Sequence, residues 1–184
     1  SDALKIATEI HAGQQDKAGG PYIKFMEHVA SKLKEAGESE EVQIVGLLQD
    51  TITDSTGKTA QDLLNAGVTT SPQLLQMPFA LVPAEMVSLI ELLTHHKDQP
   101  YIDEYSCKLM AEGIPAEEAT YEAREKEFLI FVETLKQNPV AMKVKYALLT
   151  LLMEDKYISR NERRELKTKF RLHKYQSALE ALKN

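Results

Sequence analysis

The sequence predicts an all-helical protein, and two observations carry this prediction. Apolar residues recur at helical spacing through most of the 184 residues, and no pair of alternating apolar and polar segments indicates a sheet. Gly and Pro residues stand between these segments, where they end one helix or begin the next. A chain of this length is typical of one domain with one hydrophobic core. We therefore expect a single domain, residues 1–184, built as a bundle of about eight helices.

Four helices are expected in the first half of the chain. They cover residues 3–11, about 25–36, 40–53 and 59–66, and Thr59 has the residue type of a helix cap. Residues 40–53 are apolar enough for a buried helix at the middle of the core. Residues 68–82 contain two prolines and are predicted to form a long loop.

The second half follows the same pattern. Helices are expected at 83–95, 101–110, 116–137, 139–153 and 161–182, and Pro residues stand at the start of the first and the fourth. Residues 139–153 are apolar almost all round, which indicates a buried helix. We expect this helix to pack beside the helix at 40–53.

Composition restricts the class of protein. Hydrophobic residues make up 43% and charged residues 27%, the balance of a globular protein, and no apolar segment is long enough to cross a membrane. The net charge of -6 disfavours binding to DNA, and the basic run at 160–171 also contains glutamates, which is typical of a solvated helix face. No secretion signal opens the sequence, and the single Cys107 excludes an internal disulfide. We expect a cytoplasmic protein without a membrane partner.

Residues 11–23, with the sequence HAGQQDKAGGPYI, concentrate turn-forming and polar residues in one loop. This segment resembles the opening signature of small HD-domain phosphohydrolases related to the hydrolase half of RelA/SpoT enzymes. Further agreement lies at Leu47-Leu48-Gln49-Asp50, Leu93-Thr94-His95, Asn138-Pro139, Val144-Lys145, Lys174-Tyr175 and Ala178-Leu179. The resemblance covers nearly the whole chain, apart from apparent insertions at about 69–81 and 107–124.

The resemblance implies a helical fold with one divalent metal ion, usually manganese, held by two histidines and two aspartates. Metal-bound water then attacks a phosphate ester or pyrophosphate. Three of the four expected ligands are replaced here: Phe25 and Gln49 stand at the histidine positions and Leu148 at one aspartate position, while Asp50 is kept. Phenylalanine and leucine offer no lone pair, and a glutamine oxygen is a weak neutral donor. We therefore expect no metal cofactor.

A second pair of catalytic positions also differs from the family pattern. Family hydrolases have a Glu-Asp pair after the ligand doublet, and this chain has Thr53 and Asp54. Asp50 and Asp54 are thus interpreted as remnants of a catalytic site without activity. A buried Asp50 would need a partner, and either Lys17 or Lys145 could supply it.

Four residues are candidates for ligand binding. Lys17 and Gly19 lie in the loop that contacts the nucleotide in related hydrolases, and a lysine beside such a loop can meet a phosphate. Tyr22, at the end of the loop, either packs in the core or stacks on a base. His95 stands near a helix end, where an imidazolium could contact an anion or be a solvated surface group.

Three functional hypotheses remain open from the sequence. The first is a degenerate HD-type domain that binds a guanine nucleotide, another phosphorylated small molecule or a protein partner. The alternative is an active nucleotide phosphohydrolase that holds Mn²⁺ with altered ligands, namely Gln49, Asp50, Asp54 and His28. The third is a scaffold whose inserted segments, rich in apolar residues within 69–81, mediate self-association or partner binding.

Overall fold

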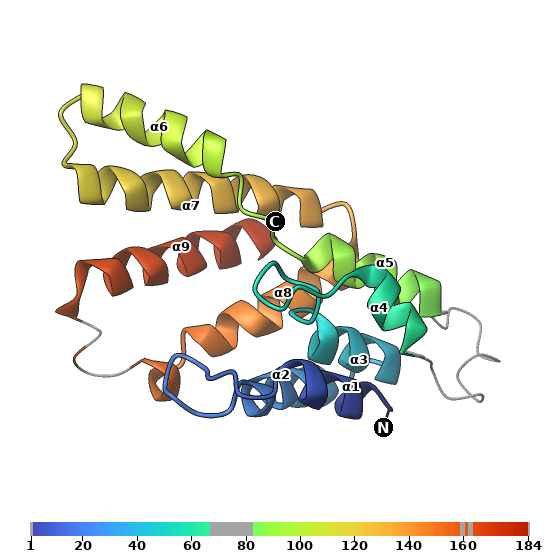
Figure 1. Ribbon diagram of the computed structural model, residues 1–184. Coiled ribbons are helices and arrows are strands. Elements are labelled where there is room, and N and C mark those ends of the chain that lie inside the picture. Colours follow the sequence, from blue (N-terminus) through green and yellow to red (C-terminus); the bar gives the residue numbers. More distant parts are fainter. Residues whose placement is uncertain (1, 67–82, 159–160, 162–163, 184) are drawn as a thin grey trace.

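The computed structural model describes residues 2–66, 83–158, 161 and 164–183, and within them the predicted all-helical bundle of about eight helices is confirmed (Figure 1). The predicted loop at 68–82, with the insertion at 69–81, lies outside the described residues. In the described part of the chain the helices are α1 Asp2–Ile10, α2 Tyr22–Glu35, α3 Glu40–Leu48, α4 Ala60–Asn65, α5 Pro83–Leu93, α6 Gln99–Ala111, α7 Ala116–Leu135, α8 Pro139–Leu152, the 3-10 helix η2 Asp155–Tyr157 and α9 Leu166–Lys183.

Helix α8 is the centre of the bundle. It contacts α2, α3 and α5 on one side and α7 and α9 on the other (Figure 1). Its buried residues include Val144, Leu148, Leu149 and Leu151, which follow from a sequence that is apolar almost all round. Asn138 caps the helix by accepting hydrogen bonds from the N–H groups of its first turn. The expected packing of this helix beside α3 is confirmed.

Helix α3 is shorter than predicted, because it ends at Leu48 and not at Thr53. Side chains donate hydrogen bonds to carbonyls in the last turn of the helix. Thr51 Oγ1 donates to Leu48 O at 2.7 Å, and Gln49 Nε2 donates to Gly46 O at 3.1 Å. Hydroxyl groups that bond the backbone in this way compete with helix formation. Asp50 therefore lies in a turn and not inside the helix.

The last helix also begins later than predicted. The helix expected at 161–182 is α9, which starts at Leu166. Before it, Arg164 N–H donates to Asn161 O at 3.2 Å. This bond joins residues three positions apart, as in a turn, and not four positions apart, as in an α-helix.

Helices α6 and α7 form a hairpin that packs on α9 (Figure 1). Gly113 ends α6 with φ +97°, and the N–H of Ile114 donates to Leu109 O at 3.1 Å, the pattern of a glycine-terminated helix. The second apparent insertion, 107–124, comprises the end of α6, this turn and the first half of α7.

Helices α2 and α3 pack closely at Gly46, where an added Cβ would collide with Cδ1 of the buried Leu33. We expect Gly46→Val to lower the free energy of unfolding by about 1–3 kcal/mol, because a larger side chain must displace packed neighbours. Urea denaturation followed by circular dichroism measures this change. In a Leu33→Ala background the same substitution should cost clearly less, and an equal cost in both backgrounds would contradict the assignment to this contact.

Candidate functional site

The loop between α1 and α2 is held closed by its own hydrogen bonds. Asp16 Oδ1 accepts from the N–H of Gly20 at 3.0 Å, and Gly20 O accepts from the N–H of Asp16 at 2.8 Å. Gly19 has φ +89°, a conformation that residues with a side chain rarely adopt. Lys17 is exposed in this loop, and Tyr22 begins α2 directly after it. The loop backbone thus has a defined shape, which sets where Lys17 and Tyr22 begin.

Tyr22 and Lys145 engage Asp50. The Tyr22 hydroxyl donates to Asp50 Oδ2 at 2.5 Å, and burial raises the pKa of Tyr22, with the Asp50 carboxylate adding to the effect. Lys145 of α8 is only 5% exposed; burial lowers the pKa of Lys145, and attraction to Asp50 opposes this. Lys145 is one of the two lysines that sequence analysis offered as partners of Asp50, and it is attracted to that carboxylate.

The replaced metal-ligand positions are packed as core. Phe25 is 1% exposed, and its ring lies 5.7 Å from that of Tyr22 and 4.9 Å from that of Tyr157, measured between centroids. Leu148 is part of the same hydrophobic core. Gln49 is fully buried, and its Oε1 has no hydrogen-bond partner among the described residues.

These residues do not fit a divalent metal ion. Two of the four positions carry hydrocarbon, and Asp50 already accepts a hydrogen bond from Tyr22. Among these four positions, the buried polar atom without a hydrogen-bond partner in the described residues is Gln49 Oε1, a neutral oxygen; elsewhere His11 Nε2 is in the same state. Over the residues that the structure describes, no three His, Cys, Asp or Glu side chains gather closely enough to hold a metal ion.

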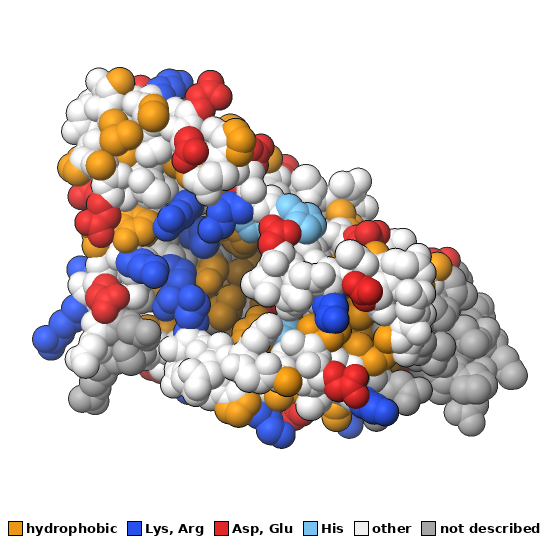
Figure 2. Space-filling model, viewed as in Figure 1, with side chains coloured by type: hydrophobic (Ala, Val, Ile, Leu, Met, Phe, Trp, Pro, Cys, Tyr) orange, Lys and Arg blue, Asp and Glu red, His pale blue; other side chains and the backbone are white. Residues whose placement is uncertain are grey.

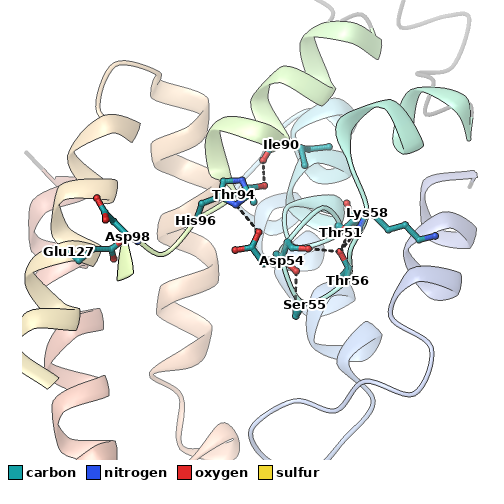
Figure 3. A network of polar contacts seen from close by, with 11 residues as sticks. Thr51, Asp54, Ser55, Thr56, Lys58, Ile90, Thr94, His96, Asp98 and Glu127 are labelled. Atoms are coloured by element: carbon teal, nitrogen blue, oxygen red, sulfur yellow. Dashed lines mark hydrogen bonds and ion pairs between the residues drawn. The ribbon is translucent and has the colours of Figure 1, made fainter. Parts of the chain in front are cut away.

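Asp54 and Asp50 contact different residues. The exposed Asp54 accepts a hydrogen bond from His96 Nδ1 at 3.0 Å, within a network of threonine and serine hydroxyls in the turn after α3 (Figure 3). His28, the substitute ligand of the alternative hypothesis, has its Nδ1 at 2.8 Å from the Tyr157 hydroxyl. Both side chains thus have partners other than Asp50.

His95 belongs to the segment that follows α5, and its side chain packs against α7. Its Nε2 lies 2.8 Å from Oε2 of the buried Glu127, and its ring stacks on Phe131 with centroids 4.8 Å apart. Asp98 N–H donates to Glu127 Oε1 at 2.8 Å, so Glu127 anchors the whole segment (Figure 3). Burial lowers the pKa of His95 although Glu127 raises it, and nearby Lys145 and Lys174 lower it further.

Lys174 of α9 is acted on electrostatically by several other cations. Burial lowers the pKa of Lys174 to about 8, and the charges that act most strongly on it are all positive. We call these residues the cationic cluster: Lys17, Lys97, Arg124, Arg171 and Lys174. Figure 2 shows Lys and Arg side chains gathered beside a hollow near α7 and α9, with hydrophobic side chains inside it.

The structure thus connects three of the four predicted ligand-binding side chains. Lys17 and His95 both interact electrostatically with Lys174, and Tyr22 interacts with Tyr175, the next residue of α9. Gly19 shapes the loop that carries Lys17.

Sequence analysis missed four members of the cluster as site residues: Lys97, Arg124, Arg171 and Lys174. No local signal marks them, because they come from three separate segments of the chain. Arg171 stands at the end of the basic run interpreted as a solvated face, yet it is half-buried.

Comparison with protein-family models gave no matching family, and comparison with curated proteins gave no matching relative. None of the helices that the structure describes has the length and apolar character needed to cross a bilayer. The site itself must therefore support any assignment.

Chemically, the site combines a carboxylate that is held by Tyr22 and attracted to Lys145 with several lysine and arginine side chains. Such an arrangement can bind and orient an anion through charge-assisted hydrogen bonds. Asp50 is engaged by Tyr22, so it is poorly placed to accept a proton from water.

Proposed function

We propose that the chain is a degenerate HD-type domain that binds a guanine nucleotide or another phosphorylated small molecule without hydrolysing it. The observation that carries this proposal is the state of Asp50, the one ligand residue kept. Its carboxylate is hydrogen-bonded by Tyr22 and attracted to the buried Lys145, in a core that also contains Phe25 and Leu148. A binding function needs cations that face a ligand, and the cationic cluster supplies them.

The physical argument against hydrolysis concerns what the reaction needs. In this class of enzyme the metal ion generates hydroxide near neutral pH and stabilises charge on the phosphoryl oxygens. One carboxylate and one glutamine oxygen would have to replace a set of four ligands. Water can complete the coordination of a divalent cation, but one carboxylate and one neutral amide oxygen supply far less charge than two aspartates and fewer donors than the set of four.

We expect the purified protein, incubated with excess manganese and then freed of unbound ion, to retain far less than one manganese per chain. Elemental mass spectrometry measures this directly. In parallel we expect isothermal titration calorimetry in EDTA to detect binding of guanosine tetraphosphate, with no pyrophosphate released over prolonged incubation.

About one manganese per chain, together with metal-dependent turnover, would overturn the proposal. The active-hydrolase alternative with Gln49, Asp50, Asp54 and His28 as ligands would then hold. In that case Asp50→Ala should abolish the turnover.

A further inference from the structure

A cavity of about 490 Å³ lies where α2, α8 and the end of α9 meet. Pockets that bind small molecules in proteins have volumes of this order. The described residues that line it include neither Asp50 nor Lys145 nor any member of the cationic cluster. The cavity is therefore separate from the candidate site described above, and a ligand bound in it is independent of the proposed function.

The walls of the cavity are largely apolar. Met142, Tyr146 and Ala147 contribute one face of α8, because residues four or five positions apart lie on the same side of a helix. Leu33 of α2 and Leu182 of α9 also line the cavity, and the rest of each side chain is buried in the core. Contact of this apolar surface with water is unfavourable, so a ligand that covers it gains about 25 cal/mol for each Å² of apolar area removed from water.

The charged side chains at the cavity have a positive sum. Lys32 and Lys143 line it, against one carboxylate, that of Glu38. Lys143 Nζ lies 3.1 Å from Glu38 Oε1, and Lys32 Nζ lies 3.1 Å from Glu154 Oε1. Glu154 is shared with Lys156, whose Nζ lies 3.3 Å from Glu154 Oε2, so three lysines stand against two glutamates in this group. A ligand with one negative charge completes the balance.

Both lysines that line the cavity keep donors for such a ligand. An ammonium group has three N–H donors, and the described ion pairs of Lys32 and Lys143 use one donor each. A carboxylate can therefore accept a hydrogen bond from either lysine without displacing Glu38 or Glu154. Hydrogen bonds of this charged kind are stronger than those between neutral groups.

The size of the cavity limits the ligand to a small molecule. A cavity of about 150 Å³ holds benzene, so this larger one accepts an apolar body of roughly ten to fifteen non-hydrogen atoms. A protein partner would have to cover about 800 Å² of this chain, which extends beyond the cavity onto charged helix surface. Lys34 and Glu35 of α2 are exposed there, and lysine and glutamate are depleted in protein interfaces.

We propose that this cavity binds a small amphiphile that has one carboxylate and an apolar chain or ring. The apolar part lies against Leu33, Met142 and Ala147, and the carboxylate accepts hydrogen bonds from Lys32 or Lys143. Because the ligand contacts α2, α8 and α9 together, its binding stabilises the folded state.

Isothermal titration calorimetry of the full chain with decanoate, kept below the concentration at which it forms micelles, tests the charge preference. We expect decanoate to bind at least about tenfold more tightly than decylammonium, which has the same chain and the opposite charge. The double variant Lys32→Gln, Lys143→Gln should weaken decanoate binding by about tenfold or more, since it removes both donors. Lys5→Gln, which changes an exposed lysine of α1, is the control and should leave the affinity unchanged.

A second variant tests the cavity itself. Ala36 is an exposed residue at the end of α2 that lines the cavity, and Ala36→Trp should fill part of the space. We expect this variant to weaken the binding of decanoate by about tenfold or more, because the apolar chain loses its place. Ala111→Trp, at the exposed end of α6, is the matched control and should bind decanoate as the wild type does.

Three outcomes would overturn the inference. The first is no decanoate binding at concentrations up to about 1 mM. The second is an affinity for decanoate that stays unchanged in the lysine double variant and in Ala36→Trp, both with wild-type circular dichroism. The third is a wild-type dimer that Ala36→Trp converts to a monomer in light scattering, because a second copy of the chain would then occupy the cavity. Manganese retention tests the proposed function separately, since Asp50 does not line the cavity.

Discussion

Replacing Asp50 by Asn should lower the free energy of unfolding by about 2–4 kcal/mol at pH 7, because Lys145 then remains buried without its counter-charge. Burial lowers the pKa of Lys145, and attraction to the Asp50 carboxylate opposes this fall. Without it the pKa of Lys145 should fall further. Chemical denaturation at several pH values measures both effects.

The control for this prediction is a double-mutant cycle. Lys145→Met alone should also destabilise the protein, because it leaves Asp50 with Tyr22 but without a cation. Asp50→Asn together with Lys145→Met should recover much of the loss, since replacing both buried partners is often close to neutral. Additive losses would show that Asp50 and Lys145 do not act as a pair.

Lys174→Met should raise the free energy of unfolding by about 1–3 kcal/mol at pH 7. The pKa of Lys174 is lowered from 10.5 to about 8, so the charged form is disfavoured in the folded state. Methionine keeps the apolar stem of the side chain and removes the charge, while the lost contacts with the rings of Phe128 and Tyr175 offset part of the gain. Thermal and urea denaturation of both proteins measure the difference.

The pH dependence of this difference has a definite sign. Between the folded pKa of about 8 and the unfolded value of 10.5, the unfolded state binds more protons at Lys174, so wild-type stability rises with pH. The advantage of Lys174→Met should therefore be greatest below pH 8 and shrink above it. A difference that stays constant from pH 7 to pH 10.5 would contradict the burial of a charged Lys174.

Several other titratable or charged groups lie around Lys174. They are Lys97 before α6, Arg124 on α7, Arg171 on α9, Lys17 in the first loop, and His95 with its partner Glu127. Because both proteins contain these groups, comparing the variant with the wild type largely cancels their own titration.

The helices were predictable because their signals are local. Thr59 caps α4, and Pro83 and Pro139 begin α5 and α8, as expected from the sequence. The end of α3 was predicted too late, because the apolar pattern continues through Ile52 while the hydroxyl of Thr51 takes a backbone carbonyl. Hydrophobic spacing alone does not reveal this competition.

The candidate site was predictable only in part. The loop with Lys17 and Tyr22 has a recognisable local sequence, and Asp50 stands in a short motif. The cationic cluster has neither, because its members are spread from residue 17 to residue 174 and meet only when α7, α9 and two loops have packed. The same holds for Glu127, whose contact with His95 joins residues 32 positions apart.

The central place of α8 also has a consequence for the order in which the chain can acquire structure. Helices α2 and α3 pack on α8, which follows them by about a hundred residues in the sequence. A ribosome adds roughly 5–20 residues each second, so the apolar faces of α2 and α3 wait about 5–20 s for their partner during synthesis. The first helices thus emerge as an incomplete layer, and the native core forms only when residues 139–152 have left the ribosome.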